Sequence, residues 1–166
     1  MFKKILTKPI ILIVILGTLI YGGWVLLFVP IKAPETEFHL IDNQAVSLNQ
    51  LKGQVVILNF WATDCVSCIA EMPALSQIYQ NNKSQGLELI AVAVARDNPE
   101  KVVRFAQKQA LPFKVTYDAT GQIADKWGPI RVTPTTIIID RKGRVTQEIT
   151  GKITQGQLEE AIRAYL

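Results

Sequence analysis

Cysteine and histidine are scarce in this chain, and that scarcity limits the chemistry available to it. The 166 residues contain two cysteines, Cys65 and Cys68, and one histidine, His39. Two cysteines cannot build a disulfide-stabilised scaffold. A structural zinc site needs four ligands, and His39 lies far from the cysteines in sequence. The chain also has no internal repeat and no low-complexity tract. Whatever the cysteines do, they do as one pair.

Acidic residues are absent from the first 33 positions, and residues 10–29 carry no charge of either sign. A helix of twenty residues spans about 30 Å, the thickness of the hydrocarbon core of a bilayer. We therefore predict a transmembrane anchor at 10–29 after a cytoplasmic tail at 1–9. A cleaved signal peptide is the alternative, because lysines precede the run. The run is longer than a usual signal core, however, and no small-x-small cleavage site follows it.

The flanking charges predict the orientation of this anchor. Lys3, Lys4 and Lys8 precede the apolar run, and only Lys32 follows it closely. The N-terminus should stay in the cytoplasm, with the remainder facing the periplasm or the extracellular side of an inner or plasma membrane. Fourteen basic and fourteen acidic residues remain after residue 33, so this part is formally neutral. No electrostatic feature favours nucleic-acid binding.

Strand and helix patterns alternate after an extended linker at 30–36, within one expected domain at 37–166. The first two strands form an N-terminal hairpin, and two continuous apolar runs read as buried strands. The expected strands are 38–41, 45–48, 55–60, 87–95, 113–117, 135–140 and 144–149, and the expected helices are 65–83, one that opens at 98–100 (with Asn98 as its cap) and runs at least through residue 106, 122–127 and 154–166. Such alternation predicts an α/β fold with a central mixed sheet flanked by helices.

The two cysteines lie where a buried strand ends and a helix begins. Helix amides and the helix dipole stabilise a thiolate in the first turn, so Cys65 should have a lowered pKa. Cys68 lies one turn deeper, within reach of Cys65. Such a pair can open a partner's disulfide and then resolve the mixed disulfide. Half of a zinc site and a purely structural disulfide are the alternatives; so short a disulfide loop would stabilise the fold only weakly.

Three segments carry a resemblance to a known family. Residues 59–68, Asn-Phe-Trp-Ala-Thr-Asp-Cys-Val-Ser-Cys, resemble the thioredoxin active-site segment, and Pro73 stands where thioredoxins have a helix proline. Residues 131–136 resemble the family's cis-proline loop. With the anchor, the hairpin, Glu-Met-Pro at 71–73 and an extra segment at about 96–115, the chain is most similar to the TlpA/ResA-like branch of anchored thiol–disulfide oxidoreductases.

This resemblance implies a thioredoxin-like fold and several site residues. Cys65 and Cys68 would be catalytic, Pro134 would be cis, and Thr133 and Trp61 would contribute to substrate binding. A trans turn proline is the alternative for Pro134, since a cis bond costs about 0.5–1 kcal/mol. Glu71 matches a glutamate near the active site of ResA-like proteins, where it could take a proton from Cys68. A solvated helix carboxylate is the alternative for Glu71.

The sequence also departs from the family pattern. Asn59 stands where thioredoxin has a buried aspartate, so that route for proton transfer is absent. Asp64 precedes Cys65, and its charge should raise the Cys65 pKa unless the carboxylate faces solvent. Val66 and Ser67 replace the dipeptides of better-known members, which leaves the redox potential open. His39 should lie on the surface, and Trp127 in the core.

The predicted function is an extracytoplasmic disulfide reductase without cofactor or metal. The resemblance implies exported disulfide-containing substrates, such as apocytochrome c or copper-site assembly proteins, and a membrane thiol-transfer protein as electron donor. An oxidase or isomerase would use the same residues. A thiol peroxidase or a non-enzymatic copper carrier on this scaffold would need a different cysteine loop or a late histidine, and the chain has neither.

Overall fold

The computed structural model describes residues 15–18, 22, 31–128 and 130–166. The chain divides into two compact units, Met1–Pro30 and Ile31–Leu166. In the first unit, residues 15–18 and 22 are helical, and the Thr18 hydroxyl donates to the Ile15 carbonyl at 2.8 Å. The expected tail and most of the expected anchor lie outside the described residues. Within the described part, no helix has the length and apolar character needed to cross a membrane.

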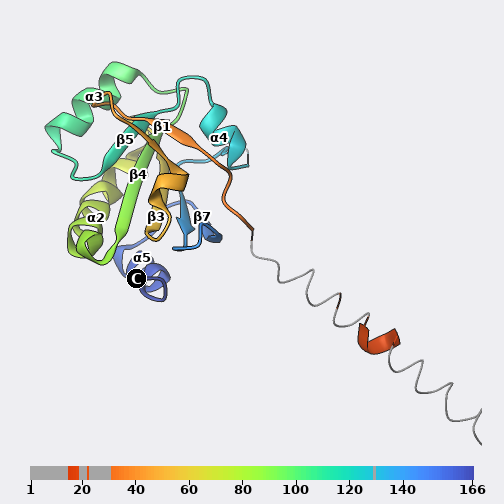
Figure 1. Cartoon of the computed structure of the whole chain (residues 1–166). Helices are drawn as coiled ribbons and strands as arrows, with labels where there is room; N and C mark the ends of the chain where they lie inside the picture. The colour runs from red at the N-terminus through yellow and green to blue at the C-terminus, as the bar shows by residue number, and fades with distance from the viewer. Residues whose placement is uncertain (1–14, 19–21, 23–30, 129) are drawn as a thin grey trace, which may run out of the picture. The chain divides into compact units, whose positions relative to one another are not determined.

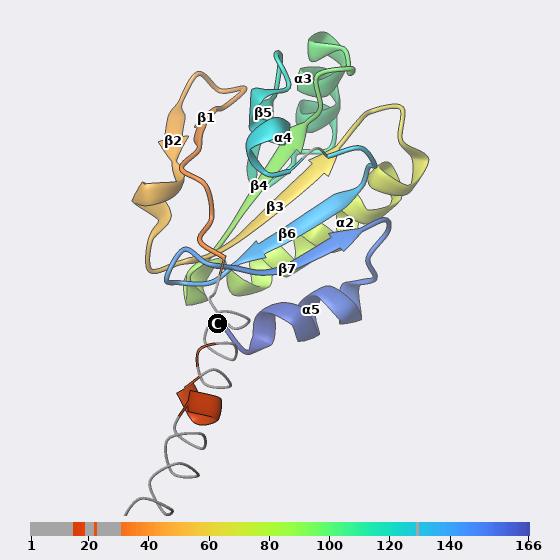
Figure 2. The ribbon, with the colours of Figure 1, turned by 90° about the vertical axis from the view of Figure 1, so that its right-hand side faces the viewer.

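The second unit is built on a five-stranded sheet in the order β5-β4-β3-β6-β7 (Figure 2). β3 is parallel to β4, β4 is parallel to β5, and β6 and β7 continue the sheet in antiparallel fashion. The strands are β3 (Val55–Trp61), β4 (Leu87–Ala93), β5 (Lys114–Tyr117), β6 (Thr135–Ile139) and β7 (Val145–Thr150). The predicted mixed sheet is confirmed, and the apolar runs at 55–60 and 87–95 contain its strands β3 and β4, of which β4 ends two residues before the predicted end.

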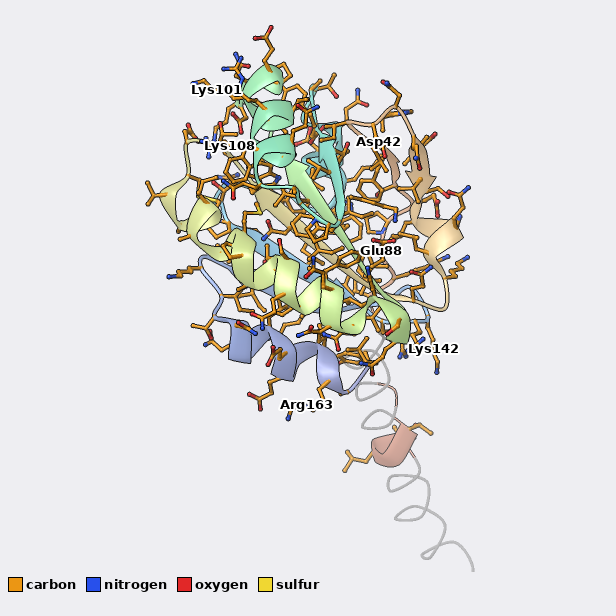
Figure 3. All side chains as sticks on the ribbon, turned by 90° about the vertical axis from the view of Figure 1, so that its left-hand side faces the viewer. Asp42, Glu88, Lys101, Lys108, Lys142 and Arg163 are labelled. Carbon is orange, nitrogen blue, oxygen red and sulfur yellow. A yellow bond between two sulfur atoms is a disulfide. The ribbon has the colours of Figure 1, made fainter. Side chains whose placement is uncertain are left out.

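Three helices cover one face of this sheet, and the N-terminal hairpin and two short helices cover the other. Side chains alternate along β3, so Val55, Ile57 and Trp61 face the helices while Val56, Leu58 and Phe60 face the hairpin. The helix side is formed by α2 (Val66–Asn82), α3 (Pro99–Lys108) and α5 (Gln155–Arg163), and the hairpin side by β1 (Glu37–His39), β2 (Ala45–Ser47), the 3-10 helix η1 (Leu48–Leu51) and α4 (Gln122–Lys126). Figure 3 shows α2 and α5 running side by side below α3. Both faces of β3 and β4 are therefore buried.

Side-chain caps start α3 and α5, and the cap of α3 is the predicted one. The Asn98 side chain accepts hydrogen bonds from the Glu100 and Lys101 amides, with Pro99 at the first helical position, as expected for α3. Thr154 caps α5 in the same manner. α5 ends at Arg163, three residues before the predicted end. A second 3-10 turn, η2 (Lys83–Gln85), links α2 to β4 and was not predicted.

The segment at 31–36, which the sequence predicts as an extended linker, makes backbone contacts with the end of the sheet. The Ala33 amide donates to the Gly143 carbonyl at 2.9 Å, and the Val145 amide donates to the Ile31 carbonyl at 2.8 Å. Ala33 and Thr36 are buried. These contacts attach the segment to the β6–β7 hairpin (Figure 1). The predicted strand at 45–48 is also one residue shorter, because Leu48 begins η1.

Candidate functional site

Cys65 and Cys68 lie at the carboxyl end of β3, where α2 begins. They form a disulfide with their Cα atoms 5.2 Å apart. Cys65 has an extended backbone and is the N-cap of α2, and the Cys68 amide points at its sulfur from 3.3 Å. The Ser67 hydroxyl lies 3.4 Å from the same sulfur. In the reduced protein, the helix N-terminus and these donors would stabilise a thiolate on Cys65.

The two sulfurs differ sharply in exposure. Cys68 is completely buried in the core between β3 and α2, whereas Cys65 is only partly buried. Between them, the Val66 side chain is 84% exposed. An incoming thiol can therefore reach Cys65 and cannot reach Cys68.

A second loop carrying a cis-proline faces Cys65. The Thr133–Pro134 peptide bond is cis, as the resemblance implied. The Thr133 carbonyl oxygen lies 3.4 Å from the Cys65 sulfur, while the Pro134 carbonyl accepts a hydrogen bond from the Gly151 amide. Val132 is 50% exposed beside the loop. The structure thus brings Thr133 and Pro134 to the cysteines across 68 residues of sequence.

The loop after β4 connects these two loops, and sequence patterns did not identify it. One Arg96 nitrogen lies 2.7 Å from an Asp64 carboxylate oxygen, and the other donates to the Thr133 hydroxyl at 2.9 Å. The next residue, Asp97, accepts from both the backbone amide and the hydroxyl of Thr63, each at 2.6 Å. The only sequence signal was a charged pair directly after a buried strand.

The contact with Arg96 changes the expected effect of Asp64 on Cys65. The hydrogen bond and the charge of Arg96 lower the pKa of the Asp64 carboxyl, with Lys101 adding a weaker effect in the same direction. The Asp64 side chain is also 70% exposed. The positive charge of Arg96 therefore balances the negative charge of Asp64, and the rise in the Cys65 pKa that was expected from Asp64 should be largely offset.

Glu71 is buried on α2, one turn after Cys68, and is only 2% exposed. The Asn59 side-chain amide donates to one carboxylate oxygen at 2.9 Å and to the Thr136 hydroxyl at 3.1 Å. Burial raises the pKa of the Glu71 carboxyl, while the Asn59 hydrogen bond, the Ile153 amide and the Lys152 charge act in the opposite direction. Glu71 is thus not a solvated carboxylate. Its role in proton transfer stays a prediction.

Other predicted residues have definite places. Trp61 is fully buried and packs against Phe105 with ring centroids 5.3 Å apart, so it offers no surface to a substrate in this disulfide state. This differs from the expected substrate contact and assigns Trp61 to core packing. His39 is exposed on β1, and Trp127 is buried with its indole N–H donating to Thr36. Both of these predictions are confirmed.

Next to the cis-proline loop lies an open groove of about 280 Å³. Arg96, Ile130, Arg131 and Thr133 contribute to its lining. Cys65 does not line this groove, but Thr133, whose carbonyl oxygen lies 3.4 Å from the Cys65 sulfur, does. Within the part of the chain that the structure describes, no group of three His, Cys, Asp or Glu side chains is placed to hold a metal ion.

Comparison with known proteins gives consistent matches. The family model described as Redoxin matches residues 31–165. A thiol-disulfide oxidoreductase ResA from Bacillus thuringiensis subsp. konkukian is 33% identical over 168 residues, which cover 97% of this chain and 96% of that protein. Among solved structures, a thiol:disulfide interchange protein of the thioredoxin family from Chlorobium tepidum TLS aligns with a TM-score of 0.77 and 26% identity, covering 82% of this chain and 97% of the other. StoA from Bacillus subtilis aligns with a TM-score of 0.68 and 26% identity, covering 80% and 98%.

Proposed function

The chain belongs to the Redoxin family and is a thioredoxin-like thiol–disulfide oxidoreductase of the TlpA/ResA-like branch, and from this we propose that it reduces disulfides of exported proteins outside the cytoplasm. The observation that carries the proposal is the unequal exposure of the two sulfurs. Cys65 meets the surface and the cis-proline loop, whereas Cys68 is completely buried. Cys65 can therefore exchange with the disulfide of a partner protein, and Cys68 can then resolve the mixed disulfide.

The reaction begins with the pair in its dithiol form. The Cys65 thiolate attacks one sulfur of the substrate disulfide, and the other substrate sulfur leaves as a thiolate and takes up a proton. Cys68, as thiolate, then attacks the Cys65 sulfur. This second exchange releases the remaining substrate sulfur and leaves the Cys65–Cys68 disulfide. The substrate has gained two electrons and two protons, and the protein pair has lost them.

Two features of the chain assist these steps. The N-terminus of α2 stabilises the Cys65 thiolate, both when it attacks and when it leaves. Cys68 must lose its proton inside the core, where a thiolate is costly. Glu71 lies one turn further along the same helix with a raised pKa and could accept that proton.

The structure shows the oxidised pair, which must receive two electrons before another cycle. A donor dithiol can deliver them only through Cys65, because Cys68 is inaccessible. We assign this role to a membrane thiol-transfer protein. The apolar run at 10–29 and the lysines before it support an anchored protein whose redox domain faces outward. Apocytochrome c cysteines and the thiols of copper-site assembly proteins fit such a location.

Two measurements test the proposal. Equilibration of the full chain in thiol–disulfide buffers gives its reduction potential, and a reductase requires a potential nearer that of thioredoxin, about −270 mV, than that of the oxidant DsbA, about −120 mV. In intact cells, a membrane-impermeant maleimide should label Cys65 after mild reduction. A strongly oxidising potential would make the protein an oxidase instead, and labelling only after lysis would place the domain in the cytoplasm.

A further inference from the structure

Arg96 makes two side-chain contacts with the loops that surround Cys65. Its guanidinium reaches the carboxylate of Asp64, the residue before Cys65, at 2.7 Å. It also donates to the hydroxyl of Thr133, the residue before cis-Pro134, at 2.9 Å. The two partners are separated by 69 positions of sequence, yet one planar group joins them. Arg96 is thus a physical link between the nucleophile loop and the cis-proline loop.

We propose that Arg96 is a positioning residue of the redox site, which balances the charge of Asp64 beside Cys65 and holds Thr133 at a fixed distance from the Cys65 sulfur. The proposal deepens the oxidoreductase function and assumes that Cys65 is the attacking cysteine. It explains how the Asp64 carboxylate can lie next to the Cys65 thiolate without lowering the reactivity of that thiolate. It also explains why an arginine suits the position, because lysine cannot present two diverging donors in one plane.

The remaining charges around the site do not replace Arg96 in this role. The other charged side chains near these loops are Glu71, Asp97, Lys101, Asp125, Arg131 and Lys152. Among them, Asp97 is engaged with Thr63, and Glu71 is buried behind the pair. Lys101, at the first turn of α3 (Figure 3), acts on Asp64 more weakly than Arg96 does. Arg96 is the described cation that contacts Asp64 directly.

The Asp64–Arg96 pair is itself exposed, with 70% and 53% of the two side chains accessible. Exposed ion pairs have modest effects that salt reduces further. The expected changes in thiolate reactivity are therefore severalfold and not orders of magnitude. Exposure has an experimental advantage, because replacing either side chain leaves no hole in the core.

The test measures the alkylation rate of Cys65 in the reduced full chain as a function of pH, with mass spectrometry identifying the modified cysteine. Arg96→Gln leaves the Asp64 charge unbalanced and should slow alkylation at pH 7 about two- to fivefold. Asp64→Asn leaves the Arg96 charge unbalanced and should accelerate it by a similar factor. The double variant removes both charges and should return to within about twofold of the wild-type rate.

Arg104→Gln is the matched control, because Arg104 is an exposed arginine on α3 with no ion pair among the described residues. It should leave the rate unchanged. A merely structural role for Arg96 would lower stability without producing opposite effects of Arg96→Gln and Asp64→Asn. If both single variants slow alkylation, or if Arg96→Gln matches Arg104→Gln, the proposal is overturned. The Asp64→Asn result decides the matter if Arg96→Gln does not fold.

Arg96→Lys separates charge from positioning. It keeps the positive charge, so the pH profile of Cys65 alkylation should stay near that of the wild type. It loses the two-pronged link, so kcat/KM for reduction of a protein disulfide such as insulin should fall. An unchanged kcat/KM would remove the positioning part of the proposal. Alkylation of Cys65 needs no protein substrate. If the wild-type chain reduces no disulfide, the proposed function fails, but the alkylation rates of the variants still test the charge balance between Asp64 and Arg96.

Discussion

The polar contacts beneath the disulfide can be tested by replacing Asn59 with leucine. Leucine has the same number of side-chain heavy atoms in the same branched arrangement, although its methyl groups are bulkier, so the change removes polar contacts without opening a cavity. Asn59 is completely buried and uses both protons of its amide group, one toward Glu71 and one toward the Thr136 hydroxyl. In Asn59→Leu, both partners stay buried and lose these hydrogen bonds.

The cost of this change depends on the charge of Glu71. A lost neutral hydrogen bond costs about 0.5–1.5 kcal/mol, and one to a charged group about 1.5–3 kcal/mol. At pH 7 we expect Asn59→Leu to lower the free energy of unfolding by about 2–4 kcal/mol. The Asn59 hydrogen bond lowers the Glu71 pKa, so its removal raises that pKa further. Below pH 4.5 the carboxyl is protonated in both the folded and unfolded states, and the cost should shrink.

Urea unfolding followed by tryptophan fluorescence measures this cost, because Trp61 and Trp127 are both buried. With a slope of about 2 kcal/mol per molar urea, the middle of the usual range, the midpoint should fall by roughly 1–2 M at pH 7. In a Glu71→Gln background, the cost of Asn59→Leu should no longer vary with pH. A loss below about 1 kcal/mol at pH 7, or an equal loss at pH 4 and pH 7.5, would refute the reasoning.

Three further predictions concern single contacts. Glu71→Gln should stabilise the protein at pH 7.5 and not at pH 4. Because the pKa of Glu71 is raised in the folded protein, the wild type loses stability as pH rises from 4.5 through the folded pKa, and glutamine does not. Unfolding curves of the variant and the wild type that coincide at both pH values would contradict this. Asp97→Ala should lower the free energy of unfolding by about 2–3 kcal/mol, because Asp97 accepts two hydrogen bonds from Thr63, and Thr63→Val should lower it by about 1 kcal/mol. A larger loss for Thr63→Val than for Asp97→Ala in thermal melts would contradict a stabilising role of these two bonds. Trp127→Phe should cost about 1–2 kcal/mol, because Thr36 is buried and loses its indole donor, and an unchanged urea midpoint would show that this bond contributes nothing.

Much of the fold could be predicted because its central strands and helices have strong local patterns. Val55 to Phe60 is a continuous apolar run, and its burial on both faces follows directly. Asn98-Pro99 marked the start of α3 through local chemistry alone. The extent of the N-terminal hairpin was less clear. Gln50 bonds back to the Ser47 amide and diverts the chain into η1, where apolar alternation had suggested continued strand.

The same distinction applies to the site: residues in short sequence motifs could be predicted, and contacts between distant segments could not. Cys65, Cys68 and Pro134 stood out because their short motifs resemble a known family. The helical spacing after Cys68 placed Glu71 one turn from the pair but left open whether it is buried, and its bond to Asn59 joins a helix to a strand and has no local signal. Arg96 lies 32 positions after Asp64 in an irregular loop. No periodicity or spacing rule connects those two residues, and only the folded sheet brings them together.

Trapping of a mixed disulfide tests the division of labour between the cysteines most directly. Reduced Cys68→Ser and Cys65→Ser variants of the full chain are incubated with the same disulfide-containing protein and analysed by non-reducing electrophoresis and mass spectrometry. Because Cys65 meets the surface and Cys68 is completely buried, the Cys68→Ser variant should accumulate a covalent complex through Cys65, and the Cys65→Ser variant should form little or none. Equal trapping by both variants, or a complex formed only through Cys68, would contradict the account.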